Sequence, residues 1–143
     1  ANLLSGGYDV ILDAIDDAKA KVAIAAYCRV NKQPLVMTGG AGGRLDPTRI
    51  QSADFAKATG DRLLAKVRNQ LRRDHGFPKG DKSKFGIQCI YSDEQVQKPQ
   101  NEGCETDAGV TGLNCSGYGS TVCVTAPFGM AAAALVLNLL QKS

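Results

Sequence analysis

Three aspartates near the start of the chain are the residues whose types and spacing best suit chemistry. Asp13 interrupts an apolar run from Val10 to Ile15, and Asp16 and Asp17 end it just before a helical pattern begins. Ligands of open α/β sheets bind outside the carboxyl ends of the strands, so these carboxylates are candidates for holding a divalent cation and, through it, a phosphate. The simpler interpretation is that Asp16 or Asp17 caps the next helix, and the local sequence favours the cap.

A second candidate feature is a strongly basic stretch between residues 60 and 86. Eight basic side chains oppose three aspartates there, which gives a local charge of +5, whereas the whole chain carries +3. Such asymmetry suggests a polyanionic partner, although a solvated helix face is an equally good interpretation. The candidate nucleic-acid-binding residues are Arg62, Lys66, Arg68, Arg72, Arg73, Lys79, Lys82 and Lys84.

The run Gly39–Gly43 is a third candidate, because its backbone amides could cradle phosphate. However, the run lacks the Lys-Ser/Thr ending of a P-loop, and no G-x-G-x-x-G occurs in the chain. We therefore favour a flexible turn at the end of the strand, where the backbone must pass close to another element.

The five cysteines give little support to metal chemistry. They stand at positions 28, 89, 104, 115 and 123, without a C-x-x-C pair, so a zinc site of the usual spacing is not supported. An odd number of widely spaced cysteines fits a reducing compartment.

The order of elements that must position these residues predicts an α/β fold. A strand around residues 10–15, a helix over 18–31 and a strand over 35–38 form a βαβ unit, which requires parallel strands. The helix has Val22, Ala25, Ala26 and Arg29 on one face. The nearly continuous apolar run of the first strand suits a strand covered on both faces.

The second half of the chain predicts two further helices and two strands. A short strand is expected over residues 49–54, an amphipathic helix over 61–74 and a strand over 85–92, and residues 93–120 are loop-like. The apolar segment 122–140 is long enough to cross a membrane. We expect a buried helix instead, because Thr125, Pro127 and Asn138 interrupt the run and a parallel sheet needs a cover.

The length of 143 residues suits a single domain spanning 1–143. The chain opens without Met and leads directly into a buried-looking strand, so we expect it to be a fragment.

Four blocks that cover nearly the whole chain, from about Tyr8 to Leu140, resemble a known family. They are ILDAIDDAKAKVAIAAYCRVNKQPLVMTGGAGGRLDPTRIQ, DRLLAKVRNQLRRDHG, GIQCIYSDE and NCSGYGSTVCVTAPFGMAAAAL. They resemble the tRNA threonylcarbamoyladenosine dehydratases, a branch of the ubiquitin-activating-enzyme-like superfamily. The resemblance implies the C-terminal part of a doubly wound, Rossmann-like sheet with covering helices. The N-terminal nucleotide-binding half, with its glycine-rich ATP loop, would then be absent.

The resemblance also implies an activity and its site residues. The family adenylates the carboxylate of N6-threonylcarbamoyladenosine beside the tRNA anticodon with ATP, and ring closure follows with net loss of water. The superfamily's metal-binding aspartate matches Asp16, which would hold Mg²⁺ and, with it, ATP. Cys115 stands where some superfamily members place a sulfur-accepting or thioester-forming cysteine, and a loop residue without a chemical role is the alternative. We expect the isolated fragment to be inactive.

Partners and alternatives follow from the same resemblance. The implied partners are tRNA, a second copy in a homodimer, and a cysteine desulfurase with its sulfur-acceptor protein. The implied location is cytoplasmic, without stable membrane insertion. Two other functions stay open: activation of a ubiquitin-like sulfur-carrier protein, and a non-catalytic tRNA- or partner-binding module.

Overall fold

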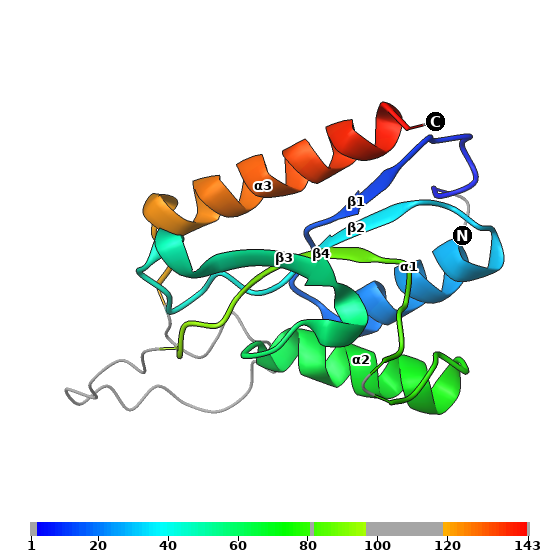
Figure 1. The fold of residues 1–143 in the computed structure, drawn as a ribbon, viewed down its shortest axis with the longest axis horizontal. Helices are drawn as coiled ribbons and strands as arrows, with labels where there is room; N and C mark the ends of the chain where they lie inside the picture. The colour runs from blue at the N-terminus through cyan, green and yellow to red at the C-terminus, as the bar shows by residue number, and fades with distance from the viewer. Residues whose placement is uncertain (1–2, 81, 97–118, 143) are drawn as a thin grey trace, which may run out of the picture.

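The computed structural model describes residues 3–80, 82–96 and 119–142, and these residues form a four-stranded sheet with helices on both faces (Figure 1). Two short 3₁₀ turns, Pro47–Arg49 and Phe55–Lys57, flank the third strand. In chain order the elements are β1 (Ile11–Asp13), α1 (Ala18–Val30), β2 (Leu35–Thr38), β3 (Ile50–Asp54), α2 (Arg62–Asp74), β4 (Gln88–Ser92) and α3 (Val122–Leu140).

The order of strands in the sheet is β1-β2-β4-β3. β1, β2 and β4 are parallel, with Leu12 opposite Val36 and Met37 opposite Cys89, and β3 pairs antiparallel with β4 at the other edge. The predicted βαβ unit is therefore confirmed. Its parallel strands bring the chain after β1 and the chain after β2 to the same edge of the sheet.

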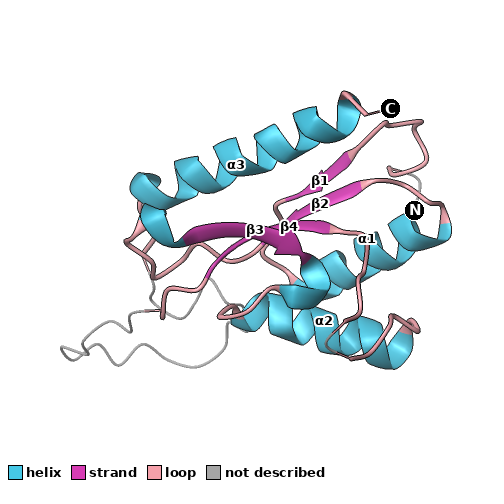
Figure 2. Cartoon of the chain, viewed as in Figure 1, coloured by secondary structure: helices cyan, strands magenta, loops and turns pink. Residues whose placement is uncertain are grey.

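The helices divide into two layers. α1 and α2 cover one face of the sheet and α3 covers the other (Figures 1 and 2). The larger core lies beneath α1 and α2, whereas Val36, Ile90, Val124, Phe128 and Ala132 form the smaller core beneath α3. Helices on both faces are what a doubly wound sheet predicts.

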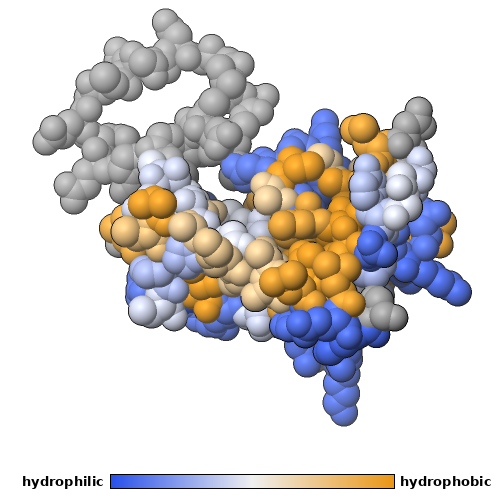
Figure 3. Space-filling view, turned by 90° about the horizontal axis from the view of Figure 1, so that it is seen from above, coloured by the Kyte–Doolittle hydropathy of each residue, from blue (hydrophilic) through white to orange (hydrophobic). Residues whose placement is uncertain are grey.

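The two outer elements, β1 and α3, are less buried than their apolar sequences predict. Leu12 is 46% exposed, because β1 is an edge strand and α3 packs against β2 and β4. In α3 only Val124, Phe128 and Ala132 are buried, while Met130 and Leu137 are 75% and 60% exposed. The expectation of a buried helix was wrong for this outer side, where apolar side chains gather on the surface (Figure 3). α3 is long and apolar enough to cross a membrane by length and composition alone.

The start of α1 decides which aspartate is the helix cap. The Asp17 side chain accepts a hydrogen bond from the backbone N–H of Ala20 at 2.6 Å, and its backbone is extended, as an N-cap requires. Asp17 therefore caps the helix, and the adjacent Asp16 is left for another role.

Asp17→Ala should lower the free energy of unfolding by about 1 kcal/mol, because it removes the cap of α1. Asp16→Ala should change that free energy by less than about 0.5 kcal/mol, because Asp16 is exposed and does not cap the helix. Urea denaturation followed by circular dichroism measures both values. Equal losses in the two variants would contradict the assignment of the cap.

Candidate functional site

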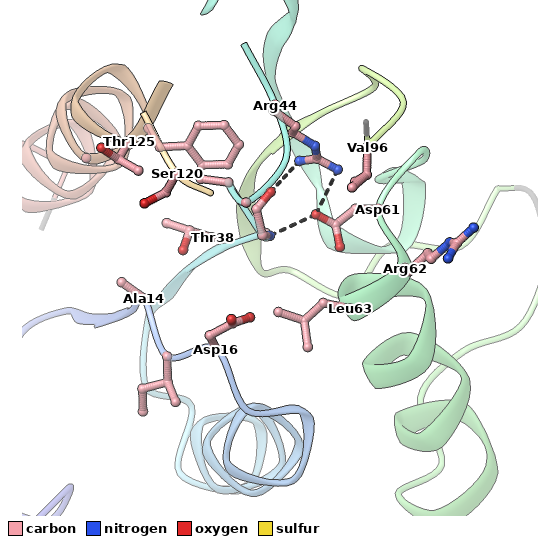
Figure 4. Close-up of a pocket in the computed structure, with 17 residues that line it drawn as sticks. Ala14, Asp16, Thr38, Arg44, Asp61, Arg62, Leu63, Val96, Ser120 and Thr125 are labelled. Carbon is pink, nitrogen blue, oxygen red and sulfur yellow. Dashed lines mark hydrogen bonds and ion pairs between the residues drawn. The ribbon is translucent and has the colours of Figure 1, made fainter. Parts of the chain in front are cut away.

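A cavity of about 460 Å³ opens at the carboxyl ends of β1 and β2. The loop after β1 contributes Asp16, β2 and the glycine run contribute a second wall, and the start of α2 contributes a third (Figure 4). α3 closes the remaining side with Thr125 and Phe128. The cavity therefore lies where ligands of open α/β sheets bind.

Asp61 ties the glycine run to the start of α2. Its Oδ1 accepts the backbone N–H of Leu64 at 2.9 Å and so caps α2, while its Oδ2 accepts the N–H of Gly40 at 2.9 Å. The same Oδ2 lies 3.3 Å from Nη2 of Arg44, and both residues are buried. Arg44 also donates to the carbonyl oxygens of Gly40 and Gly60. Removing one partner of such a buried pair leaves an uncompensated charge, so the pair fixes the loop to the helix.

The glycine run is a close-packed turn rather than an open phosphate cradle. A Cβ at Gly39 would lie 2.4 Å from Oδ2 of Asp61. The amides of Gly39, Gly40 and Gly43 already donate to Ile90 O, to Asp61 and to Gly119 O. The predicted close approach of backbone to another element is therefore confirmed, and it explains the need for glycine.

Asp16 is exposed, and its carboxylate points into the cavity (Figure 4). Among the described residues, no group of three or more His, Cys, Asp or Glu side chains is arranged to hold a metal ion. A lone carboxylate fits Mg²⁺ as one donor, because this ion usually binds through one or two carboxylates together with substrate phosphates and water.

The structure divides the predicted basic residues into two groups. Arg68, Arg72 and Arg73 are engaged within the chain. Arg68 donates to Ala58 O, and burial lowers the pKa of its guanidinium. Arg72 donates to Pro78 O and Ser83 and lies over the ring of Phe85. Arg73 pairs with Asp74 at 2.7 Å.

The other five predicted basic residues are exposed, and the side chain of Arg62 points outward in Figure 4. They are Arg62, Lys66, Lys79, Lys82 and Lys84.

Cys115 lies outside the described residues, so its predicted catalytic role stays a prediction. Of the three described cysteines, Cys28 and Cys89 are buried and Cys123 is exposed, and none of them lines the cavity. Burial raises the pKa of the Cys28 and Cys89 thiols, which makes both poor nucleophiles.

Sequence reasoning missed Arg44 and Asp61 as wall residues of the cavity. Asp61 had a detectable signal, because an aspartate directly before an amphipathic pattern predicts an N-cap. Arg44 follows a glycine run in a loop, and no local pattern indicates that its side chain is buried.

Comparison with curated proteins finds close relatives of one kind. The chain is 46% identical to the tRNA threonylcarbamoyladenosine dehydratase of Escherichia coli K12 over 144 residues, which cover 96% of this chain and 54% of that protein. It is 44% identical to the protein of the same name from Haemophilus influenzae Rd, over 99% of this chain and 54% of that protein. The chain therefore spans about half the length of the curated relatives it matches. No protein-family model matches.

Solved structures give the same result. The E. coli tRNA N6-threonylcarbamoyladenosine dehydratase in complex with ATP superposes with a TM-score of 0.82 and 41% identity, over 99% of this chain and 52% of that one. The complex of the same enzyme with AMP gives 0.81 and 42%. The resemblance inferred from the four sequence blocks is confirmed, and so is the mixed α/β fold.

Gly39→Ala should lower the free energy of unfolding by about 1–3 kcal/mol, because the new methyl group displaces the Asp61 carboxylate from its partners. Gly40→Ala is the matched control. Its Cβ would meet nothing closer than 3.9 Å, so we expect a change within about 0.5 kcal/mol. Thermal and urea unfolding of the two variants measure the difference. Equal stability would contradict the close packing of Gly39 against Asp61.

Proposed function

Because the chain resembles the tRNA threonylcarbamoyladenosine dehydratases over nearly all of its length, we propose that it acts in the ATP-dependent dehydration of N6-threonylcarbamoyladenosine beside the tRNA anticodon. The observation that carries the proposal is the position of Asp16. This residue lies in the first of the four blocks that resemble the family, does not cap α1, and faces the cavity at the carboxyl end of β1.

The proposed chemistry has two steps. The substrate carboxylate attacks the α-phosphorus of ATP, pyrophosphate leaves, and the carboxyl carbon becomes an acyl adenylate. A nucleophile of the same substrate then attacks that carbon and displaces AMP, which closes a ring with net loss of water. Adenylation is needed because a carboxylate oxygen is a poor leaving group, whereas AMP is a good one.

The residues of this chain contribute position and charge to that chemistry. Asp16 would supply one carboxylate to Mg²⁺, and the ion would neutralise phosphate charge there. The Asp61–Arg44 pair holds the wall opposite, and Phe128 makes part of the cavity apolar. Because the amides of Gly39, Gly40 and Gly43 are already engaged, we propose that the ATP phosphates are bound by the portion of the relatives that this chain does not match. The isolated chain would then be inactive.

Analysis of tRNA nucleosides by mass spectrometry tests the activity. Cells that lack the gene encoding this chain should lose the cyclised adenosine, and the intact gene should restore it. Asp16→Asn should not restore it, because the amide is a far weaker cation ligand. Asp17→Asn is the matched control, because asparagine caps a helix as well as aspartate does, so it should restore the nucleoside.

Other outcomes identify the alternative functions. Loss of a thiolated cofactor with unchanged tRNA nucleosides would favour activation of a sulfur-carrier protein. Unchanged nucleosides together with measurable tRNA binding would favour a non-catalytic binding module. Restoration of the cyclised adenosine by Asp16→Asn would contradict the role of Asp16.

We also propose that tRNA contacts the exposed basic residues of α2 and of the following loop, and that a second copy of the chain is a partner. Lys66 and Lys82 are exposed and lie outside the cavity, so they carry charge without shaping the site. Phosphate contacts of this kind position a nucleic acid without reading its sequence. The exposed apolar side of α3 supports association with a second copy.

Replacing Lys66 and Lys82 together by Ala should weaken tRNA binding and reduce the slope of log K against log salt by about two. The matched control replaces Lys19 and Lys142, two exposed lysines outside the basic stretch, and should leave the slope unchanged. Filter binding at several salt concentrations measures both. The same affinity and slope in the two variants would show that the basic surface is only solvated.

A further inference from the structure

Lys21 carries a fully buried ammonium next to the loop that presents Asp16. Its Nζ lies 3.2 Å from Oδ2 of Asp13, the last residue of β1, and the side chains of Lys21 and Asp13 are 1% and 0% exposed. Apart from this ion pair, neither of the two atoms has a hydrogen-bond partner among the described residues. Lys21 does not line the cavity, so it does not take part in the chemistry proposed above.

Stability alone is a poor reason for such a pair. Desolvation of two charges offsets most of their attraction, and well-packed apolar residues of similar size often serve as well or better. We therefore ask whether Lys21 orders the backbone next to it rather than adding to the stability of the protein.

The Lys21 ammonium acts at the start of the loop that carries Asp16, and the first backbone hydrogen bond of α1 holds the end of that loop. At the start of the loop, Asp13 uses its Oδ1 to accept the backbone N–H of Ile15 at 2.9 Å, while Lys21 holds its Oδ2. At the end of the loop, the backbone N–H of Lys21 donates to the carbonyl oxygen of Asp17 at 3.0 Å. Asp16 lies between these two anchors, and its carboxylate faces the cavity.

We propose that Lys21 is a positioning residue: through its ion pair with Asp13 it fixes the loop over residues 14–17 and so aims the Asp16 carboxylate into the cavity. The ammonium keeps the Asp13 carboxylate in place as the acceptor for Ile15, and a charge-assisted acceptor is stronger than a neutral one. The inference rests on the proposed function of Asp16, and its tests separate the two.

Amide hydrogen exchange, measured by NMR on the whole chain, tests the positioning. Lys21→Met should accelerate exchange of the Ile15 amide at least tenfold more than exchange of the β4 core amides, such as that of Cys89. Lys21→Arg, which keeps the charge, should restore the wild-type ratio of the two rates. Leu71→Ala is the matched control, because it destabilises the core from a fully buried position of α2 and should leave the ratio unchanged.

Binding of Mn²⁺ alone, followed through paramagnetic broadening of the loop amides, gives the second readout. Wild type should show broadening that Asp16→Asn abolishes. Lys21→Met should raise the Mn²⁺ concentration at half-broadening at least tenfold, and Leu71→Ala should not change it. If Lys21→Met does not fold, Lys21→Gln, which keeps a donor without the charge, takes its place under the same criteria.

The outcomes are distinguishable. If the exchange ratio is unchanged in Lys21→Met, the proposal is overturned. If wild type binds Mn²⁺ through Asp16 but Lys21→Met has the same Mn²⁺ midpoint, the proposal is overturned as well. If wild type and Asp16→Asn broaden alike, the proposed cation role of Asp16 fails. The exchange ratio then still decides whether Lys21 positions the loop.

Discussion

The carboxylate of Asp61 joins three segments that are distant in the sequence, and the shape of the cavity depends on this junction. One oxygen caps α2, the other holds the amide of Gly40, and Arg44 balances the charge while it also holds the carbonyl of Gly60. The close approach explains why position 39 must be glycine. A second buried carboxylate, that of Asp13, accepts the backbone N–H of Ile15 and pairs with Lys21 at the opposite wall. Both walls are thus held by an aspartate with a buried cation beside it.

Much of the fold could be predicted because its signals are local. Apolar periodicity located the first helix, the strand over residues 35–38 and the basic amphipathic helix, and the βαβ order implied parallel pairing. The exposure of Leu12 and of the outer side of α3 could not be predicted, since it depends on where α3 crosses the sheet. An apolar run predicts that a segment is buried, but it does not predict which element covers it.

The candidate site shows the same division. Asp16 and Asp17 are indistinguishable by local sequence because both precede a helix, and only the backbone geometry assigns the cap to Asp17. The burial of Lys21 and Arg44 could not be predicted from the sequence, since a buried lysine or arginine is identified only by its ion-pair partner in the fold. Arg29, which the sequence placed on the same helix face as Val22 and Ala25, is exposed and lies over the ring of Phe77, while Cys28 and Lys21 are buried. The resemblance to the dehydratases pointed to Asp16, and the structure shows that its neighbour Asp17 is engaged as the cap of α1.

The residues that line the cavity come from nearly the whole length of the chain, from Ala14 to Gly129, and this has a consequence for biosynthesis. During translation the first wall leaves the ribosome long before α3 is made. Until α3 arrives, the face of the sheet around Val36 and Ile90 has no cover. A nascent chain that still lacks α3 therefore exposes apolar side chains that α3 covers in the folded protein, and exposed apolar surface of this kind is what chaperones recognise.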